Sequence, residues 1–506
     1  MTKANLSGSG LISFRERIQK NKNLVIPKLS KEQIRVIYDQ GFEAVYQLIE
    51  TLQNAIQLLE ERVTILESRI AKDSHNSSKP PSSDIVKKEP RSLRKKSGRR
   101  SGGQPGHQGT TLKRVANPDH IIKHPCKGSC VCSRSLEKAK RIGVHKRQVI
   151  DIKPVVMETT EHQAEIKECA CGRIHTAPFP ADVISSVQYG KGINSLAVYL
   201  IVYQLLPFKR TQELLLDLLG VHLSEGTLKN MCAAAHNNLK ATDDAIKGQI
   251  MASAVAHVDE TGFYVMGKRW WLHATSTLRY TYYFCHPRRG REGIKAGGIL
   301  TEFKGRLIHD FWKIYFRFGG KHGLCNVHHL RELIFIHEEV KAAWAAKMKT
   351  LLLKIKESVD RGKAKNQRSL HCATRRKYRL KYEAIIRAGY RAEPAKVVKR
   401  REGQRGRIKQ SPSRNLLDRF KKYDNEVLAF MYDFSVPFSN NLVEQDIRMM
   451  KVKQKISGCF RSELGAHIFC RIRSYISTVK KQEYNVFAQL EKIFMVRNPN
   501  VNLLAE

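Results

Sequence analysis

The stretch AVAHVDETGFYVMGKRWWLHATSTLRYTYYFC, residues 254–285, contains four runs rich in β-branched and aromatic residues. These runs are AVAHVD, GFYVM, RWWLHATS and RYTYYFC, and their composition and length indicate β-strands. Residues 291–300 then have a helical pattern, and RLIHD (306–310) and HGLCNV (322–327) indicate two more strands. Strands mixed with helical segments in this way predict a mixed α/β domain.

Two of the predicted strands end on an aspartate, which is Asp259 in AVAHVDE and Asp310 in GRLIHDFW. Carboxylates at strand ends can meet in space, and their oxygens are the ligands that Mg²⁺ and Mn²⁺ prefer. Two such ions about 3.5–4 Å apart clamp the attacking and leaving oxygens of a phosphodiester. The two aspartates therefore predict a two-metal site, although an aspartate after a strand is by itself more often a turn residue.

Such a site normally needs a third carboxylate, and SVPFSNNLVEQDIRMMKVKQKI (435–456) offers Glu444 in an otherwise basic helical pattern. A helix beginning near Asn440 places Glu444 one turn from its start, with Arg448 and Lys451 on the same face. That face would combine a metal ligand with two phosphate contacts. Residue types alone leave three other acids open as the third ligand: Asp446, Glu332 and Glu260.

The charge of the chain points to a polyanionic partner. The 506 residues carry a formal net charge of +43, which favours nucleic acid, with an anionic membrane as the weaker alternative. We find no run of about 18 apolar residues that would span a membrane and no secretory leader. The expected location is the cytoplasm.

The N-terminal part contains a heptad seam followed by a basic linker. Apolar residues from Phe42 to Ile70 step by three and four, which favours a parallel two-stranded coiled coil and hence a homodimer. The alternative is that this helix packs on its own chain. The linker DSHNSSKPPSSD (73–84) leads into a basic run that we expect to contact DNA phosphates. The alternative is that this basic run is only a linker that increases solubility. The predicted contact residues of this arm are Lys95, Lys96, Arg99 and Arg100.

Five of the 11 cysteines cluster in two knuckles, and their spacing is compatible with a zinc site. The first knuckle is C-x3-C-x-C and the second is C-x-C, with Cys169 and Cys171 the surer pair. The alternative is free thiols in a module that no longer binds metal. The candidate ligands are Cys126, Cys130, Cys132, Cys169 and Cys171.

Two helical regions flank the predicted sheet. FKRTQELLLDLLGVHLSEGTLKNMCAAAHNNL (208–239) has helix-turn-helix spacing, although an ordinary helical hairpin in a core has the same pattern. Residues 328–435 are mostly helical and very basic, with Arg405 and Arg407 as candidate DNA contacts. We interpret this region as an insertion into the α/β domain.

Several long motifs resemble the bacterial insertion sequence 66 family of DDE transposases. They are HVDETGFYVMGKRWWLHATST, HDFWKIYF, CNVHHLREL, VPFSNNLVEQDIRMMKVKQKISGCFRS and FCRIRSYISTVKKQ, with NSSKPPSSD and GGQPGHQG upstream. The resemblance implies a ribonuclease-H-like catalytic fold whose carboxylates match Asp259, Asp310 and Glu444. One departure is PFSNN, where most relatives have Asp before the two Asn; we expect Ser439 to cap the helix instead.

CNVHHLRE places Cys325 three residues before His328, which resembles the Cys-x-x-His that follows the second catalytic Asp in several DDE transposase groups. We expect this pair to orient the insertion or to contact DNA near the metals, against the simpler alternative of a capping or core histidine. Trp312 lies beside Asp310 and can stack on an unpaired base, with core packing as the alternative.

The predicted architecture is multidomain α/β, with a leucine-zipper-like coiled coil, a small zinc-ribbon-like module, helix-turn-helix-like helices and a ribonuclease-H-like catalytic domain interrupted by a helical insertion. The expected boundaries are 1–72 for the N-terminal coil segment, 73–119 for the basic arm, 120–185 for the zinc module, 186–250 for the helix-turn-helix-like region, 251–327 with 437–470 for the catalytic domain, 328–436 for the insertion and 471–506 for a C-terminal helical tail.

The resemblance implies a transposase that binds terminal inverted repeats and uses two Mg²⁺ or Mn²⁺ ions for cleavage and strand transfer. It further implies a synaptic complex on double-stranded DNA, accessory proteins of the same element and a nucleoid location. Two alternatives stay open at this point: a catalytically inactive DNA-binding regulator, and a metal-dependent nuclease or resolvase on the same fold.

Overall fold

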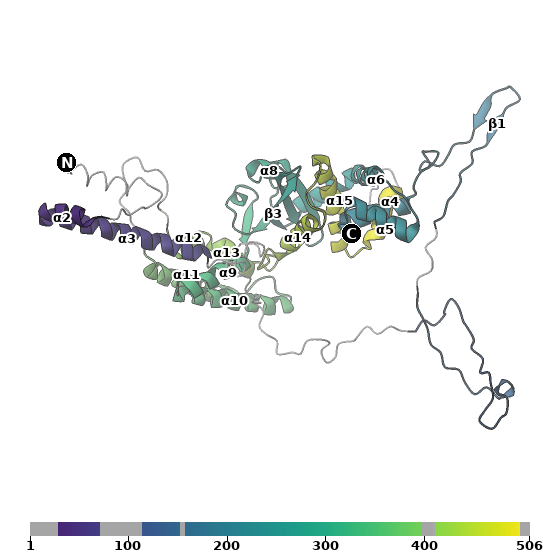
Figure 1. Ribbon diagram of the computed structural model, residues 1–506, viewed down its shortest axis with the longest axis horizontal. Helices are drawn as coiled ribbons and strands as arrows, with labels where there is room; N and C mark the ends of the chain where they lie inside the picture. The colour runs from purple at the N-terminus through teal and green to yellow at the C-terminus, as the bar shows by residue number, and fades with distance from the viewer. Residues whose placement is uncertain (1–28, 71–113, 152–156, 396–407, 409, 496–506) are drawn as a thin grey trace. The chain divides into compact units, whose positions relative to one another are not determined.

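The computed structural model describes residues 29–70, 114–151, 157–395, 408 and 410–495 (Figure 1). Its described residues divide into two compact units. The larger unit takes in residues 187–208 and 226–506 together with the N-terminal residues to 89, and the smaller takes in 90–186 and 209–225. The predicted DNA contacts Lys95, Lys96, Arg99, Arg100, Arg405 and Arg407 lie outside the described residues.

A five-stranded sheet in the order β5-β4-β3-β6-β7 forms the centre of the larger unit. β5, β4 and β3 are antiparallel neighbours, whereas β3, β6 and β7 run parallel. This confirms the predicted mixed α/β domain. The strands are β3 (Val255–Val265), β4 (Lys268–Ser276), β5 (Thr281–His286), β6 (Arg306–His309) and β7 (Lys321–Leu324).

The runs AVAHVD and GFYVM form one continuous strand, β3, and the prediction of two separate strands was wrong. β3 stays paired with β4 along its length, from His257 opposite Ser276 to Val265 opposite Lys268. Gly262 does not interrupt it because the residue faces Trp271 across the pair, inside a regular ladder. A Cβ at Gly262 would lie 3.0 Å from Arg269 Nε, so the glycine leaves room for the Arg269 side chain.

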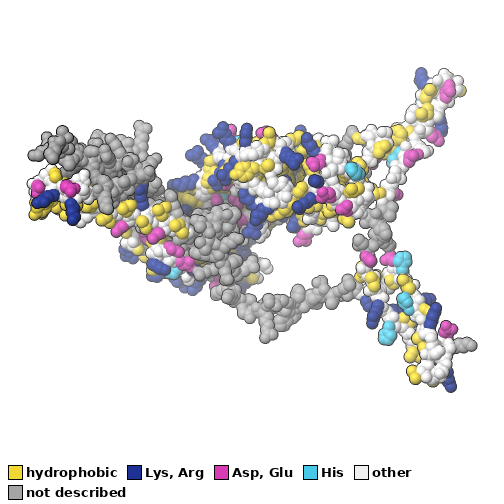
Figure 2. All heavy atoms as spheres, viewed as in Figure 1, with side chains coloured by type: hydrophobic (Ala, Val, Ile, Leu, Met, Phe, Trp, Pro, Cys, Tyr) yellow, Lys and Arg dark blue, Asp and Glu magenta, His cyan; other side chains and the backbone are white. Residues whose placement is uncertain are grey.

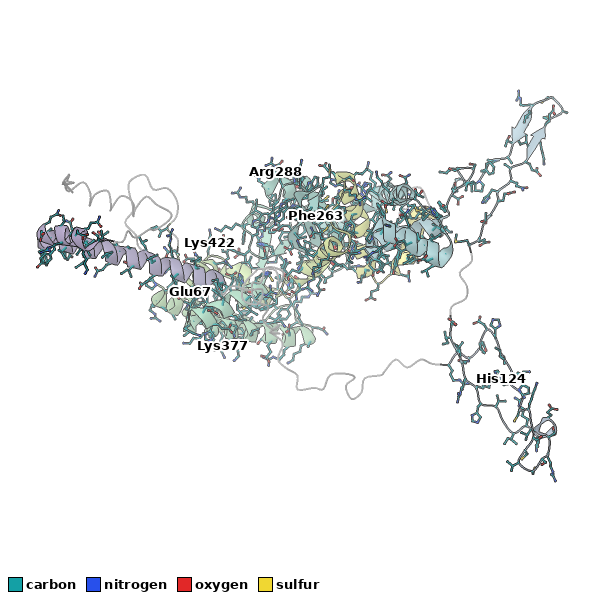
Figure 3. All side chains as sticks on the ribbon, viewed as in Figure 1. Glu67, His124, Phe263, Arg288, Lys377 and Lys422 are labelled. Atoms are coloured by element: carbon teal, nitrogen blue, oxygen red, sulfur yellow. The ribbon has the colours of Figure 1, made fainter. Side chains whose placement is uncertain are left out.

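Helices cover both faces of the sheet, and the side chains of β3 pack into a different hydrophobic core on each face. Phe263, labelled in Figure 3, and Val265 belong to a core shared with helices from both ends of the unit. Ala256 and Val258 face a second core with α7 and α8. The covering helices are α4 (Lys191–Val198), a π-helical turn (Tyr199–Tyr203), α6 (Glu225–Asn238), α7 (Lys240–Met251), α8 (Arg291–Ala296), α14 (Asn441–Ser457), α15 (Glu463–Lys481) and α16 (Val486–Met495).

Two helices near predicted domain boundaries pack into the larger unit. α15 crosses residue 470, and its buried Tyr475, Ile476 and Val479 belong to the same core as Phe263. Residues 471–481 are therefore part of the layer of helices that packs on the sheet. Likewise α6 buries Leu228 and Cys232 along its apolar face, so it is a core helix of the larger unit.

The segment between β7 and α14 is helical, with a core of its own. Ile308 of β6 and Leu324 of β7 pack into that core and join it to the sheet. Where the segment leaves and rejoins the sheet, the backbone N–H of Asn326 donates to the carbonyl oxygen of Phe438 at 3.0 Å. Its described helices are α9 (Asn326–Glu339), α10 (Ala343–Ala364), α11 (Cys372–Ala392), α12 (Pro412–Lys422) and α13 (Asp424–Tyr432).

The predicted N-terminal helix is present as α3 (Phe42–Ile70), preceded by α2 (Lys31–Asp39). Ser30 and Gln33 form a reciprocal capping box at the start of α2. Seam residues of α3 such as Ile56, Val63 and Leu66 are about half exposed. The helix is thus confirmed, and its pairing with a second copy stays a prediction.

The smaller unit has little regular structure among its described residues. It contains the short antiparallel pair β1 (Ile166–Glu168) and β2 (Ile174–Thr176), a 3₁₀ turn at Leu136–Lys138, and most of α5 (Phe208–Leu219). α5 ends at Gly220, whose φ of +66° lets the chain reverse direction.

Candidate active site

Asp259 and Asp310 lie where the parallel pair β3–β6 comes apart. The last paired residues are His257 of β3 and Ile308 of β6, so each aspartate follows two residues after the end of the ladder. Carboxyl ends of adjacent parallel strands meet at one edge of a sheet, which is where α/β proteins commonly build sites. Asp310 follows the last residue of β6, whereas Asp259 lies within β3, which continues beside β4 to Val265, so the prediction that Asp259 ends a strand was wrong. Both carboxylates lie just beyond the end of the parallel ladder.

The surroundings of Asp259 contain more negative than positive charge. Burial raises the pKa of the Asp259 carboxyl well above its usual value, and the nearby acids Glu260, Asp310 and Glu444 raise it further. A cluster of buried carboxylates of this kind is costly unless a cation offsets it. Hard oxygen donors and uncompensated charge are what a Mg²⁺ or Mn²⁺ ion requires, so these residues fit such an ion.

The segment after Asp310 turns back sharply. The backbone N–H of Trp312 donates to Asp310 Oδ1 at 3.0 Å, and Phe311 between them has a φ of +81°. A left-handed conformation is costly for a residue with a Cβ and persists only where neighbouring contacts impose it. The rings of Trp312 and Tyr315 make an edge-to-face contact with centroids 5.1 Å apart, and stacking of Trp312 on an unpaired base stays a prediction.

Glu444 lies in the first turn of α14, and its N–H donates to the carbonyl oxygen of Asn440 at 3.3 Å. Its Oε1 lies 3.8 Å from His328 Nδ1 and 4.0 Å from Cys325 Sγ. Ligand atoms of these three residues all lie within 4.8 Å of one another, which in the described part of the chain is the one group of this kind. His328 and Cys325 therefore adjoin the third predicted carboxylate, and all three can contribute metal ligands.

Asn440 is a site residue that the sequence pattern did not single out. It is fully buried; its Nδ2 donates to the carbonyl oxygen of Val258 at 2.9 Å, and its Oδ1 lies 3.0 Å from His257 Nδ1. Because an amide oxygen only accepts, the His257 ring donates this bond. Asn440 thereby fastens the start of α14 to β3, one residue before Asp259.

The expected cap by Ser439 was wrong. Asn440 occupies the N-cap position of α14, and no side-chain cap bond is made there. The Asn440 amide is used for the contact with β3, and its backbone N–H donates to Cys325 Sγ at 3.2 Å. The two Asn of PFSNN were the available signal, since consecutive polar residues at a helix start often have side-chain bonds to make.

Asp446 and Glu332, two of the acids left open by the sequence, are engaged elsewhere. Asp446 accepts from Lys481 Nζ at 2.6 Å and from the hydroxyls of Ser276 and Thr281 at 2.7 and 3.1 Å. Glu332 forms an ion pair with Arg419 at 2.6 Å among the helices between β7 and α14. Their partners favour structural roles and leave Glu444 as the acid of α14 nearest to Asp259.

Glu260, the remaining alternative, is paired beside the site. Its side chain is only 3% exposed, and its Oε1 accepts from Arg289 Nη2 at 2.6 Å. Its Oε2 accepts from the hydroxyl of Tyr315. The Arg289 guanidinium lies over the ring of Trp312, 4.4 Å from the centroid. Glu260 thus links β3 to the segment that follows Asp310.

The predicted DNA contacts on α14 are accessible. Arg448 and Lys451 are exposed, and Lys451 Nζ donates to the carbonyl oxygen of Gly262 on β3 at 2.7 Å. Lys and Arg side chains are numerous on the visible face around β3 and α8, shown in dark blue in Figure 2. Positive charge near the carboxylates is the arrangement that a phosphate backbone requires.

The two cysteine knuckles have the same backbone turn. The N–H of Cys130 donates to the carbonyl of Arg134, and that of Cys169 to the carbonyl of Arg173, each at 2.9 Å. Backbone N–H groups lower the pKa of the Cys130 and Cys169 thiols, with Cys132 and Cys171 as the respective donors. Thiols with lowered pKa values are suited to metal, but the two knuckles do not come within ligand distance of each other in the described residues. Zinc binding stays a prediction.

Among the described residues, no helix is long and apolar enough to cross a membrane.

The comparisons with known proteins give two family matches. The model described as Transposase IS66 family matches residues 186–468, and a family of unknown function (DUF6444) matches residues 27–113. A search of curated proteins finds no match.

Proposed function

Because the chain belongs to the IS66 family of transposases, we propose that it binds the terminal inverted repeats of an insertion sequence and catalyses DNA cleavage and strand transfer. The observation that supports this proposal is the charge interaction of Asp259 with Asp310 and Glu444, two acids that lie far from it in the sequence. The strand order β5-β4-β3-β6-β7 supports a ribonuclease-H-like catalytic domain.

In this proposal Asp259, Asp310 and Glu444 hold two divalent ions. When bound, Mg²⁺ or Mn²⁺ supplies Lewis-acid stabilisation of the oxygens that attack and leave the phosphorus atom. Arg448 and Lys451 hold the phosphates of the scissile strand, since both are exposed on the helix that carries Glu444. Asn440 keeps that helix against β3, so the third carboxylate keeps its place relative to the other two.

The reaction consists of two in-line phosphoryl transfers. Water is the first nucleophile and frees a 3′-hydroxyl, and that hydroxyl then attacks the target strand. Neither step needs a covalent enzyme intermediate. Pairing of α3 with a second copy brings two ends together, supported by the exposed seam residues Ile56, Val63 and Leu66. Zinc at the two cysteine knuckles orders the smaller unit, supported by their matching turns.

The test is a strand-transfer assay with DNA that carries the element's own termini. We expect Asp259→Asn, Asp310→Asn and Glu444→Gln each to abolish cleavage and joining while binding of the ends survives. Retained joining in all three variants would contradict the proposal. Cleavage of branched DNA without any joining of ends by the unaltered protein would instead favour a nuclease.

A further inference from the structure

The segment after Asp310 is connected to β3 by four side chains. They are Glu260, Arg289, Trp312 and Tyr315, which we call the Arg289 cluster. Glu260 follows Asp259 on β3, whereas Trp312 and Tyr315 follow Asp310. Arg289 comes from the loop between β5 and α8, so three separate segments meet here.

Arg289 is the centre of the cluster. Its Nε and Nη2 donate to Glu260 Oε1 at 2.9 and 2.6 Å. Its guanidinium contacts two indoles, 4.4 Å from the ring centroid of Trp312 and 4.9 Å from that of Trp271 on β4. Two aromatic contacts and two hydrogen bonds to one carboxylate oxygen restrict the orientation of a planar guanidinium.

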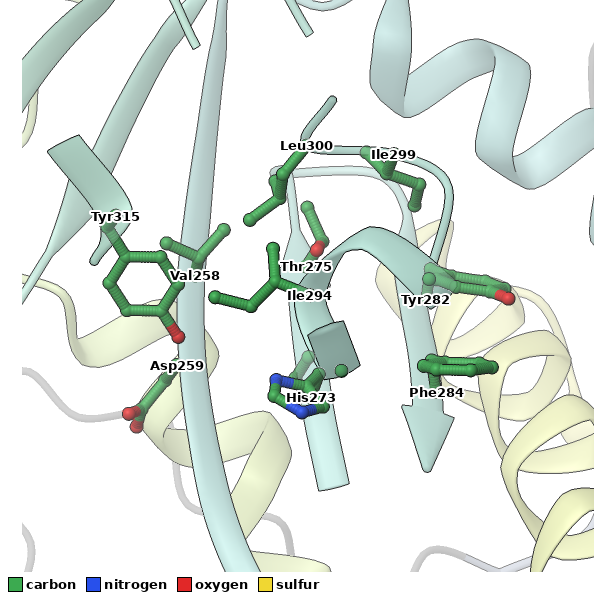
Figure 4. A pocket seen from close by; sticks show the side chains of 13 residues that line it. Val258, Asp259, His273, Thr275, Tyr282, Phe284, Ile294, Ile299, Leu300 and Tyr315 are labelled. Carbon is green, nitrogen blue, oxygen red and sulfur yellow. The ribbon is translucent and has the colours of Figure 1, made fainter. Parts of the chain in front are cut away.

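Tyr315 makes the second connection. Its ring is 2% exposed, and its hydroxyl donates to Glu260 Oε2. Figure 4 shows this hydroxyl directed toward β3 beside Asp259. Trp312 packs on Tyr315 and also donates its backbone N–H to Asp310 Oδ1. Movement of Trp312 or Tyr315 would therefore move the Asp310 carboxylate.

Two further observations argue against a purely stabilising ion pair. Glu260 is 3% exposed, and the desolvation of a buried acid offsets most of what its ion pair contributes to stability. Phe311, between Asp310 and Trp312, has a φ of +81°, a conformation that needs external contacts to persist. The Arg289 cluster supplies contacts immediately after that residue.

We propose that Glu260, Arg289, Trp312 and Tyr315 are positioning residues that hold the Asp310 carboxylate at metal-binding distance from Asp259. This inference rests on the proposed function, because it assumes that the two aspartates share divalent ions. Residues that orient metal ligands typically change metal affinity by about 10- to 100-fold when they are altered.

Binding of Mn²⁺ to the full chain without DNA, measured by electron paramagnetic resonance of the free ion, tests the proposal. We expect Trp312→Ala to weaken Mn²⁺ binding at least about tenfold and Trp312→Phe to retain it, because Phe preserves a ring over Arg289. Tyr315→Phe removes only one hydroxyl and should weaken binding several-fold. It serves as the mild variant if Trp312→Ala does not fold, which thermal melting will show.

The direction in which Arg289→Ala changes Mn²⁺ affinity distinguishes positioning from a simple charge effect. The substitution leaves the Glu260 charge unbalanced near the site, so a purely electrostatic effect would tighten Mn²⁺ binding. Positioning by Arg289 predicts weaker binding instead. The matched control is Arg288→Ala, since Arg288 is 71% exposed, pairs with Glu292 at the surface and is labelled in Figure 3.

The outcomes separate this inference from the proposed function. Mn²⁺ binding that is unchanged in Trp312→Ala, Tyr315→Phe and Arg289→Ala, but lost in Asp310→Asn, overturns the positioning role alone. Unchanged binding in Asp310→Asn overturns the proposed metal site itself. Loss of binding in Glu260→Gln with retention in Trp312→Ala would make Glu260 a ligand and also overturn the positioning role.

Discussion

Replacing Asp446 by Asn should destabilise the fold without touching the chemistry. Asp446 and Lys481 are 16% and 12% exposed, and their ion pair is 2.6 Å long. The hydroxyls of Ser276 and Thr281 donate to the same carboxylate oxygen. Removing one partner of a buried pair leaves the other charge uncompensated, which costs about 3–5 kcal/mol. We expect a value near the lower limit, about 3 kcal/mol, because Lys481 Nζ still donates to the carbonyl of Thr277 at 3.0 Å.

For a domain of about 150–250 residues a loss of about 3 kcal/mol corresponds to a fall in Tm of about 6–12 °C, and we expect the lower end because the larger unit contains more residues than that. The chain offers a matched control in Lys356 and Asp360, which are also 2.6 Å apart but are 42% and 55% exposed. Asp360→Asn should change the free energy of unfolding by less than about 1 kcal/mol. The measurement is thermal unfolding of the full chain followed by circular dichroism.

The same experiment compares Asp446 with Glu444. Glu444→Gln should melt close to the unaltered protein and lose strand transfer, whereas Asp446→Asn should keep strand transfer at a temperature well below its own Tm. If Asp446→Asn melts normally and is inactive while Glu444→Gln is active, the two acids have been assigned the wrong way round. The double variant Asp446→Asn with Lys481→Met should recover stability, since it removes both buried charges together.

Three other predictions concern other parts of the chain. Burial lowers the pKa of His257 to about 4 from an ordinary value of 6.5, so the unfolded chain binds a proton there that the folded chain does not. Below about pH 6.5 the free energy of unfolding should therefore fall, by on the order of 3 kcal/mol by about pH 4, and His257→Gln should flatten this part of a urea-denaturation pH profile. Ile56→Asp should halve the mass measured by light scattering, whereas Leu58→Asp, which is exposed but off the seam, should not. Cys169→Ser should lower the zinc content by about one ion per chain in elemental analysis, and Cys372→Ser, an exposed cysteine outside the knuckles, should leave it unchanged.

The elements that depend on local pattern were predictable from the sequence. The seam from Phe42 to Ile70 is one helix, and the aromatic and β-branched runs between 254 and 285 are strands. Each follows from a short-range period that the residues themselves impose. Asp259 and Asp310 were proposed as ligands in the same way, because each follows an apolar run that had to be buried in a sheet, and their role as ligands stays a prediction. Two predictions failed at the local level as well. AVAHVD and GFYVM were predicted as two strands and form one, and Ser439 was expected to cap α14, whose N-cap residue is Asn440.

Tertiary structure alone decided which acids belong together. Glu444 and Asp446 are two residues apart on one helix, and the sequence around them does not distinguish a metal ligand from half of a buried ion pair. The difference comes from Lys481, Cys325 and His328, which lie far from these acids in sequence and approach them only when the sheet and its helices have packed. The bonds of Asn440 to β3 and of Glu260 to Arg289 have the same origin. The period of two residues in a strand, or of 3.6 in a helix, determines the face of the element on which a side chain lies. The partner of that side chain depends on long-range contacts, which a local sequence pattern does not contain.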